Sequence, residues 1–320
     1  MFLTPEVFIN ILVDALLLLF CSFAFFISLG VVKNFDINKD TTLQYTLLKR
    51  TYLASVIVEF SLFFKIILLF YFVFTIDKIS VLLPGAMCGA GVITANSFGI
   101  YLLALKVLNI YLFGFWLLFN KEDKRTKDYH FTKLKFKFFL ALFLLLALEF
   151  VLEILYFNGI NPSKVVSCCG VLFNSVKSSG ISLLLSLPKE LVVGSFYALY
   201  ILILVFSFLK KDVLISLLSF AFIFVTILAI IVFFSPYIYE LPRHKCPFCL
   251  LQKEYYFVGY FVYLFLFLGS FLGVYEGVSS VVLKKRVDFY KKVVFFDSLV
   301  VLILSFYPLY YYFKNGIWLF

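Results

Sequence analysis

Hydrophobic positions form long runs along this chain, and charged positions collect in the short segments between them. In a bilayer every backbone polar group must be hydrogen-bonded within its own segment, so apolar runs of about 20 residues predict membrane-spanning helices. The pattern predicts eight spans, at residues 7–31, 51–75, 98–119, 138–157, 190–209, 213–235, 254–278 and 293–313. Only Lys210, Lys211 and Asp212 separate the fifth span from the sixth, which predicts a tight helical hairpin; the alternative is one long bent span.

The composition supports the same fold class. Of the 320 residues, 64% are hydrophobic and 14% charged, and the mean hydropathy is +1.07. Such a chain cannot cover its apolar residues with a water-facing shell, and eight spans leave little length for a soluble domain. We therefore expect an all-α, polytopic transmembrane helical bundle that forms a single domain over residues 1–320 and has the lipid bilayer as its main partner.

Basic residues alternate between loops. Four, seven, two and five of them lie in segments 33–50, 120–137, 210–212 and 284–292, against eight in all the other loops and both termini together. Because short basic loops stay in the cytoplasm, the pattern predicts that both termini lie outside. The expected location is a bacterial inner membrane with the functional face outward. The net charge of +10 then indicates contact with anionic lipid headgroups and no nucleic-acid partner.

The cysteines are distributed unevenly on this topology. Cys21 falls inside the first span and is expected to be a packed thiol. The other five all fall in outward loops, at Cys88, Cys168, Cys169, Cys246 and Cys249. The outer side of an inner membrane is an oxidising compartment, so cysteines gathered there point to disulfide chemistry or metal binding.

Cys246 and Cys249 form a Cys-Pro-Phe-Cys motif just ahead of the seventh span. Pro247 suits the first turn of a helix, so we expect the motif at the N-terminus of that helix, where backbone N–H groups and neighbouring basic residues favour a thiolate. His244 is a candidate base or metal ligand beside it. In this interpretation Cys246 or Cys249 attacks a disulfide or is oxidised through a membrane carrier. Cys88 with Cys168 or Cys169 then resolves the resulting disulfide.

Residues 246–253, CPFCLLQK, resemble the Cys-x-x-Cys-x-x-Gln/Glu-Arg motif of the DsbB-type quinone-linked disulfide-forming membrane proteins. The matching positions are Cys246, Cys249 and Gln252, and Lys253 stands where that family has arginine. The resemblance implies electron transfer to a membrane quinone bound near Gln252 and Lys253. It also implies disulfide exchange between a second cysteine pair and a periplasmic thiol protein.

The function is therefore expected to be that of a thiol-disulfide oxidoreductase, and two alternatives stay open. The same thiols and His244 suit a soft metal ion such as copper or zinc, which thiolate-rich sites select. In the third interpretation the cysteines form stapling disulfides in a structural membrane subunit.

Ionisable residues inside the predicted spans are a second functional signal, since a charge in the bilayer is costly unless it is paired or hydrated. Glu149 and Glu153 stand four residues apart, on one face of the fourth span. They are the candidates for a proton path that serves the redox chemistry at the outer face or ion passage, and for residues beside the cofactor of the redox site. The alternative is interhelical ion pairing, for example between Glu59 and Lys106, with Asp14, Lys65 and Asp297 also in or near spans.

Overall fold

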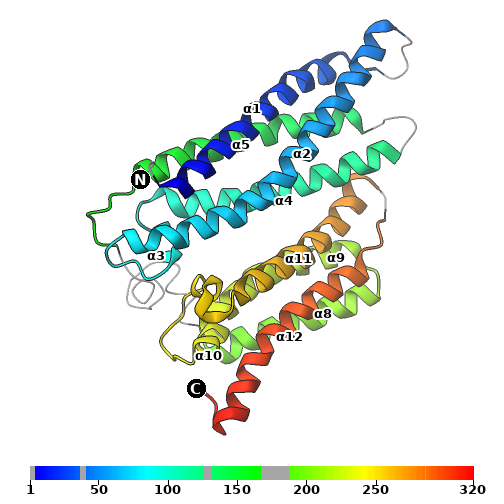
Figure 1. Cartoon of the computed structure of the whole chain (residues 1–320). Helices are drawn as coiled ribbons and strands as arrows, with labels where there is room; N and C mark the ends of the chain where they lie inside the picture. The colour runs from blue at the N-terminus through cyan, green and yellow to red at the C-terminus, as the bar shows by residue number, and fades with distance from the viewer. Residues whose placement is uncertain (1–3, 37–40, 126–130, 167–186, 285) are drawn as a thin grey trace. The chain divides into compact units, whose positions relative to one another are not determined.

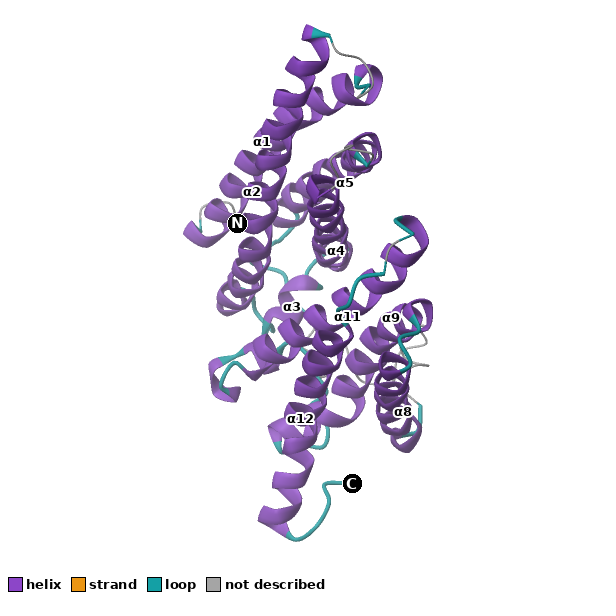
Figure 2. Cartoon of the chain, turned by 90° about the vertical axis from the view of Figure 1, so that its right-hand side faces the viewer, coloured by secondary structure: helices purple, strands orange, loops and turns teal. Residues whose placement is uncertain are grey.

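A computed structural model describes residues 4–36, 41–125, 131–166, 187–284 and 286–320. The described chain contains helices and loops and no strand (Figure 2). The long helices are α1 (Pro5–Asn34), α2 (Thr42–Ile79), α4 (Phe98–Arg125), α5 (Thr132–Asn158), α8 (Lys189–Phe208), α9 (Asp212–Ala229), α11 (Val258–Val282) and α12 (Tyr290–Asn315). In the described part of the chain eight helical segments are long and apolar enough to cross a membrane, which confirms the predicted number of spans.

The first compact unit comprises residues Met1–Pro84 and Val92–Val166. Its four long helices pack in a ring in which α1 contacts α2 and α5, and α4 contacts the same two helices (Figure 1). This is the neighbour order of a four-helix bundle whose successive helices run up and down. The bundle also includes a short 3-10 turn after α2, at Ser80–Leu82.

The second compact unit comprises Gly85–Gly91 and Ser167–Phe320. Its helices repeat the same neighbour order, because α8 contacts α9 and α12, and α11 contacts the same two helices. α9 continues through a π-helical turn, Ile230–Phe234, into α10 (Ser235–Tyr239). The structure thus divides into two compact units, and the single transmembrane domain expected for residues 1–320 remains a prediction.

The predicted hairpin between the fifth and sixth spans is present. α8 ends at Phe208 and α9 begins at Asp212, and Lys210 between them takes a left-handed conformation with a φ of 52°. A left-handed residue cannot continue a right-handed helix, so the chain reverses here.

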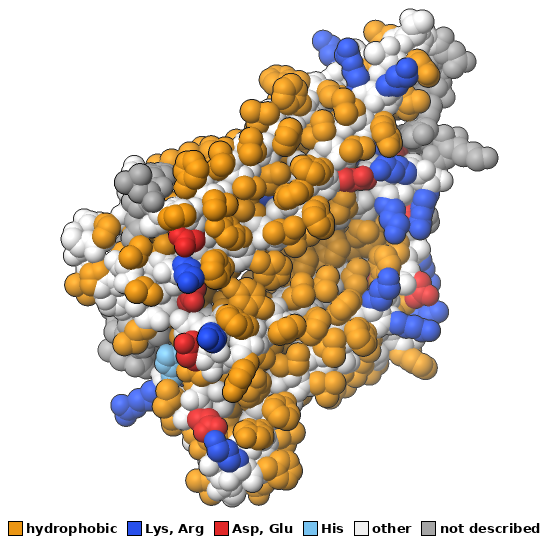
Figure 3. Space-filling view, in the orientation of Figure 1, with side chains coloured by type: hydrophobic (Ala, Val, Ile, Leu, Met, Phe, Trp, Pro, Cys, Tyr) orange, Lys and Arg blue, Asp and Glu red, His pale blue; other side chains and the backbone are white. Residues whose placement is uncertain are grey.

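The helices present apolar side chains outward and keep polar side chains inside. On α1, Asn10, Asp14 and Ser28 are buried, whereas Phe23 and Phe26 are among the most exposed residues of that helix. Figure 3 shows hydrophobic side chains covering the visible flanks of the helices, with charged side chains mainly near the helix ends. This distribution suits a lipid environment, in which outward apolar groups need no water-facing cover.

A row of glycines lets α11 approach its neighbours closely. Gly269, Gly273 and Gly277 are four residues apart, which is the small-residue spacing of tightly packed membrane helices. A Cβ atom at Gly273 would lie 2.0 Å from Ser219 Oγ on α9, and one at Gly269 would lie 2.1 Å from Asp297 Oδ1 on α12. Even one methyl group at these positions would push the helices apart.

We therefore expect Gly273→Ala to lower the free energy of unfolding by about 1–3 kcal/mol, the usual cost of overpacking. Thermal unfolding of the detergent-solubilised protein measures the effect. Gly194→Ala on α8 is the control, because a Cβ atom there has open space around it and alanine is the better helix former. Equal stability of the two variants would contradict the close packing of α9 and α11.

Candidate functional site: a cluster of three buried thiols

Three of the predicted cysteines come together in the second unit. The Sγ atoms of Cys88, Cys246 and Cys249 all lie within 4.8 Å of one another, and we call this group the thiol cluster. All three side chains are buried, with exposed fractions of 0%, 1% and 4%. The sulfurs of Cys88 and Cys246 are 3.5 Å apart, which is well beyond the length of a disulfide bond.

His244 adds a nitrogen to the thiol cluster. Its Nε2 atom lies 3.3 Å from the Sγ of Cys249, and its ring packs edge-on against Tyr239 with the centroids 4.6 Å apart. The predicted association of His244 with the cysteine motif is therefore present in the geometry. Three sulfur atoms and one ring nitrogen thus share a small volume.

Two tyrosines hold the backbone of the cysteine motif through hydrogen bonds. Tyr239, the last residue of α10, donates a hydrogen bond to the carbonyl oxygen of Cys246, and Tyr263 on α11 donates one to the carbonyl of Pro247 at 2.7 Å. Tyr239 reaches the motif at the end of the helix that carries the π-helical turn, a distortion often found at functional sites. These two hydroxyls fix the backbone between the two cysteines.

The segment that carries Cys88 is hydrogen-bonded to the segment that follows the cysteine motif. Gly85 turns the chain with a φ of 87°, and the short helix α3 (Gly89–Ile93) begins directly after Cys88. Gln252 Nε2 donates to the carbonyl oxygen of Met87 at 3.4 Å. Gln252, which the resemblance assigned to quinone binding, therefore connects the two segments of the thiol cluster, while Lys253 is exposed.

The expected position of the motif at a helix N-terminus is wrong. Cys249 begins a 3-10 turn, Cys249–Leu251, a second 3-10 turn follows at Lys253–Tyr255, and α11 begins only at Val258. Tyr256 and Phe257 both have left-handed φ values, 54° and 55°, so the α-helix cannot extend back to Cys249. Any stabilisation of a thiolate here comes from groups other than the first turn of α11.

The remaining predicted site residues lie elsewhere. Cys168 and Cys169 lie outside the described residues. Cys21 is buried in α1 of the first unit, as the sequence predicts for a packed thiol. Glu149 and Glu153 are also in the first unit, buried on α5, and both contact Lys106.

The suggested pair of Glu59 with Lys106 is wrong. Glu59 Oε1 instead lies 2.7 Å from Lys124 Nζ and accepts a hydrogen bond from Asn120. Lys106 and Asn120 are about 20 Å apart along α4, so the two groups occupy different levels of the bundle. Ion pairing between helices is thus present, with partners that the sequence did not identify.

The residues that support the thiol cluster could hardly be identified from the sequence. Tyr239 and Tyr263 are two of 21 tyrosines, and tyrosines near the ends of spans are common at membrane interfaces whatever the function. Gly259 carried a clearer signal, because a glycine in a first helical turn marks a close approach. A Cβ atom there would lie 2.9 Å from the Cβ of Leu250 in the 3-10 turn.

The eight apolar helices found among the described residues place the chain in the class of multi-pass helical membrane proteins. No known protein family, curated protein or solved structure matches the chain. The resemblance to the DsbB-type proteins therefore rests on residues 246–253 alone.

We expect Tyr239→Phe to make Cys246 more reactive. The variant loses the hydrogen bond to the Cys246 carbonyl, and a net contribution of about 1 kcal/mol corresponds to about a fivefold faster reaction of a transiently exposed thiol. Alkylation of the reduced, chelator-treated protein, followed residue by residue by mass spectrometry, measures the rate. Tyr197→Phe is the control, because that hydroxyl contacts Ser305 Oγ in the same unit. Equal rates in both variants would show that Tyr239 does not hold the motif.

Proposed function

We propose that this membrane protein binds a soft metal ion, Cu(I) or Zn(II), in the thiol cluster. The observation that carries the proposal is the convergence of the Sγ atoms of Cys88, Cys246 and Cys249 within 4.8 Å, with His244 Nε2 at 3.3 Å from one of them. Zinc–thiolate bonds of about 2.3 Å in a tetrahedral site put neighbouring sulfurs about 3.8 Å apart. Small side-chain movements would therefore bring these four donors onto one ion.

The identity of the donors supports a soft ion. Thiolates and imidazole favour Cu(I) and Zn(II), whereas Mg²⁺ and Ca²⁺ require oxygen ligands. Binding would deprotonate the thiols, and the ion would then stabilise the thiolates inside a buried site. His244 would be a neutral ligand through Nε2.

The burial of the thiols also favours an ion over a protein substrate. Disulfide exchange with a soluble protein requires attack on an accessible sulfur, and the most exposed sulfur-bearing residue of the cluster is only 4% exposed. A metal ion needs a much smaller entry path.

Thiol redox chemistry is the second candidate, because Cys88 Sγ and Cys246 Sγ are already 3.5 Å apart. Oxidation would form one S–S bond between them, release two protons and pass two electrons to an oxidant of the quinone class in the membrane. In this case Cys249 would be the third thiol, available for disulfide exchange. The quinone would bind near Gln252 and Lys253, as the resemblance to the DsbB-type proteins implies.

We expect about one copper or zinc ion per chain in protein purified without oxygen or chelators. The bound ion should protect Cys88, Cys246 and Cys249 from alkylation, and Cys246→Ser should lose it. Cys21→Ser is the matched control, since Cys21 lies in the first unit. Elemental analysis and mass-spectrometric thiol labelling of the same sample provide the two measurements. Metal-free protein with a reducible Cys88–Cys246 disulfide would reject the metal site in favour of the redox function, and reduced, metal-free, unprotected thiols would reject both.

The location of the thiol cluster on the outer side of a bacterial inner membrane is part of the proposal. The basic segments predicted to be cytoplasmic follow α1, α4, α8 and α11, so within each up-and-down bundle they share one end. The cysteine motif follows α10, at the opposite end of the second bundle. The positive-inside rule then places the motif and the C-terminus outside.

The topology predicts different labelling of two introduced cysteines in intact cells. Ile317→Cys, at an exposed position after α12, should react with a membrane-impermeant thiol reagent. Lys121→Cys, in the basic end of α4, should react only after lysis. The reverse pattern would invert the topology.

A further inference from the structure

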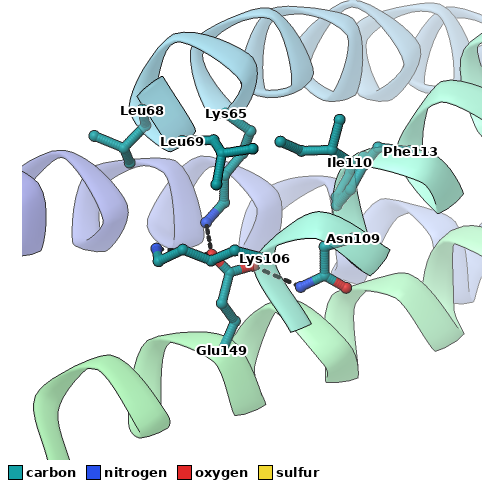
Figure 4. Close-up of a pocket in the computed structure, with 8 residues that line it drawn as sticks. All are labelled: Lys65, Leu68, Leu69, Lys106, Asn109, Ile110, Phe113 and Glu149. Carbon is teal, nitrogen blue, oxygen red and sulfur yellow. Dashed lines mark hydrogen bonds and ion pairs between the residues drawn. The ribbon is translucent and has the colours of Figure 1, made fainter. Parts of the chain in front are cut away.

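The interior of the first unit contains five ionisable side chains in one network. Asp14 comes from α1, Lys65 from α2, Lys106 from α4, and Glu149 and Glu153 from α5; all are at most 8% exposed. Lys65 Nζ lies 2.5 Å from Asp14 Oδ1 and 2.7 Å from Glu149 Oε1. Figure 4 shows Lys65, Lys106 and Asn109 converging on Glu149. We call the five residues the carboxylate–lysine network.

Lys106 joins the three carboxyl groups. Its Nζ atom lies 2.9 Å from Asp14 Oδ2, 3.0 Å from Glu149 Oε1 and 2.8 Å from Glu153 Oε2. Each ammonium group therefore contacts at least two carboxyl groups. The network is continuous across all four long helices of the unit.

The charges of the network do not balance. Three carboxylates and two ammonium groups sum to one negative charge when all five are ionised. An uncompensated charge in a bundle interior costs several kcal/mol, so a proton or a cation has to complete the network.

A metal cation fits the carboxylate–lysine network less well than a proton. Although oxygens of Asp14, Glu149 and Glu153 lie within 4.8 Å of one another, both oxygens of Asp14 and both of Glu149 already accept hydrogen bonds. Hard cations take six or more oxygen ligands, and two ammonium groups beside the site would repel a cation. A proton needs only one oxygen.

The contacts identify which carboxyl group takes the proton. Glu149 accepts from Lys65, Lys106 and Asn109, and Asp14 accepts from both lysines. Glu153 accepts only from Lys106, through Oε2, and its Oε1 is buried with no hydrogen-bond partner among the described residues. A carboxylate with one hydrogen bond is stabilised less than carboxylates with two or three.

We infer that Glu153 is a proton-binding site inside the membrane domain. A proton from the aqueous phase forms an O–H bond at Glu153 and brings the network from one negative charge to neutrality. Lys65, Lys106, Asp14 and Glu149 are the charged groups that face it from the four packed helices. One more titratable group, the thiol of Cys21, lines the adjacent pocket together with Asp14 and Lys65.

The structure contains space for water next to the network. A small cavity lined by Lys65, Lys106, Asn109 and Glu149, closed by four apolar side chains, has room for about one water molecule. One water molecule there can connect Glu149 and Lys106 to a transient water chain during proton exchange. The network lies in the first unit and is independent of the thiol cluster.

Infrared difference spectroscopy of the full chain in lipid tests the inference directly. We expect the carbonyl band of a protonated carboxylic acid near neutral pH, and the band should shift in D₂O. Glu153→Gln should remove the Glu153 band and leave that of Asp297, which is also buried and has neither carboxyl oxygen hydrogen-bonded among the described residues; the exposed control Glu190→Gln should keep both bands. If Glu153→Gln leaves every protonated-carboxyl band in place, Glu153 is ionised and the inference is wrong.

A second variant keeps Glu153 and tests the charge balance. Asp14→Asn leaves two carboxylates against two ammonium groups, so Glu153 should lose its proton and the Glu153 band should disappear. Persistence of the band in Asp14→Asn would overturn the charge-balance argument. A rise of the unfolding temperature of wild type with sodium concentration, together with absence of the band, would show a cation site in place of a proton site.

Stability separates the roles of the two glutamates. Glu153→Gln resembles the protonated side chain and should unfold within a few degrees of wild type. Glu149→Gln removes the negative charge that faces both lysines and leaves a single amide oxygen as acceptor for three donors, so its unfolding temperature should fall by roughly 10 °C. Equal losses in both variants would contradict a neutral Glu153.

Discussion

The low polarity of the membrane interior is the constraint on which the rest of this structure depends. Lipid offers no hydrogen bonds, so polar side chains within the spans lie inside the bundles, where their partners are groups of the same helix or of a neighbouring one. Both four-helix units follow this rule with apolar flanks and polar interiors. The first unit does so with ion pairs, and the second with small residues, hydroxyl groups and close glycine contacts.

The same constraint explains where irregular backbone occurs. In the described chain, Cys249 begins a 3-10 turn, Cys88 directly precedes the short helix α3, and a left-handed pair of residues separates the cysteine motif from α11, so the thiol cluster lies outside the regular spans. Regular helices could not bring Cys88 so close to two cysteines that precede another helix. The hydroxyl groups of Tyr239 and Tyr263 and the side-chain amide of Gln252 hold these irregular segments in place.

The three cysteines of the thiol cluster, all in the second unit, lie at equivalent places in the order of the helices along the chain. Cys88 lies between the second and third long helices of the first bundle in chain order, and Cys246 and Cys249 lie between the second and third of the second bundle. Although no sequence repeat is evident, the neighbour order of the helices is the same in both bundles. In an up-and-down bundle every second connection lies at the same end. Basic residues that stay on one side of the membrane therefore have to alternate between successive connections along the chain.

The sequence by itself determined the class of the protein, the number of spans and the hairpin at Lys210, because hydropathy and charge act locally along the chain. It also singled out Cys246, Cys249 and His244 as neighbours, since they are close in sequence. It did not determine the partners of Lys106 or the start of α11, because side-chain direction around a helix and two left-handed residues decide them. Only the tertiary structure brought Cys88 to Cys246 across 158 positions and left Glu153 with an unpartnered oxygen among the described residues, because both outcomes depend on how four helices pack together.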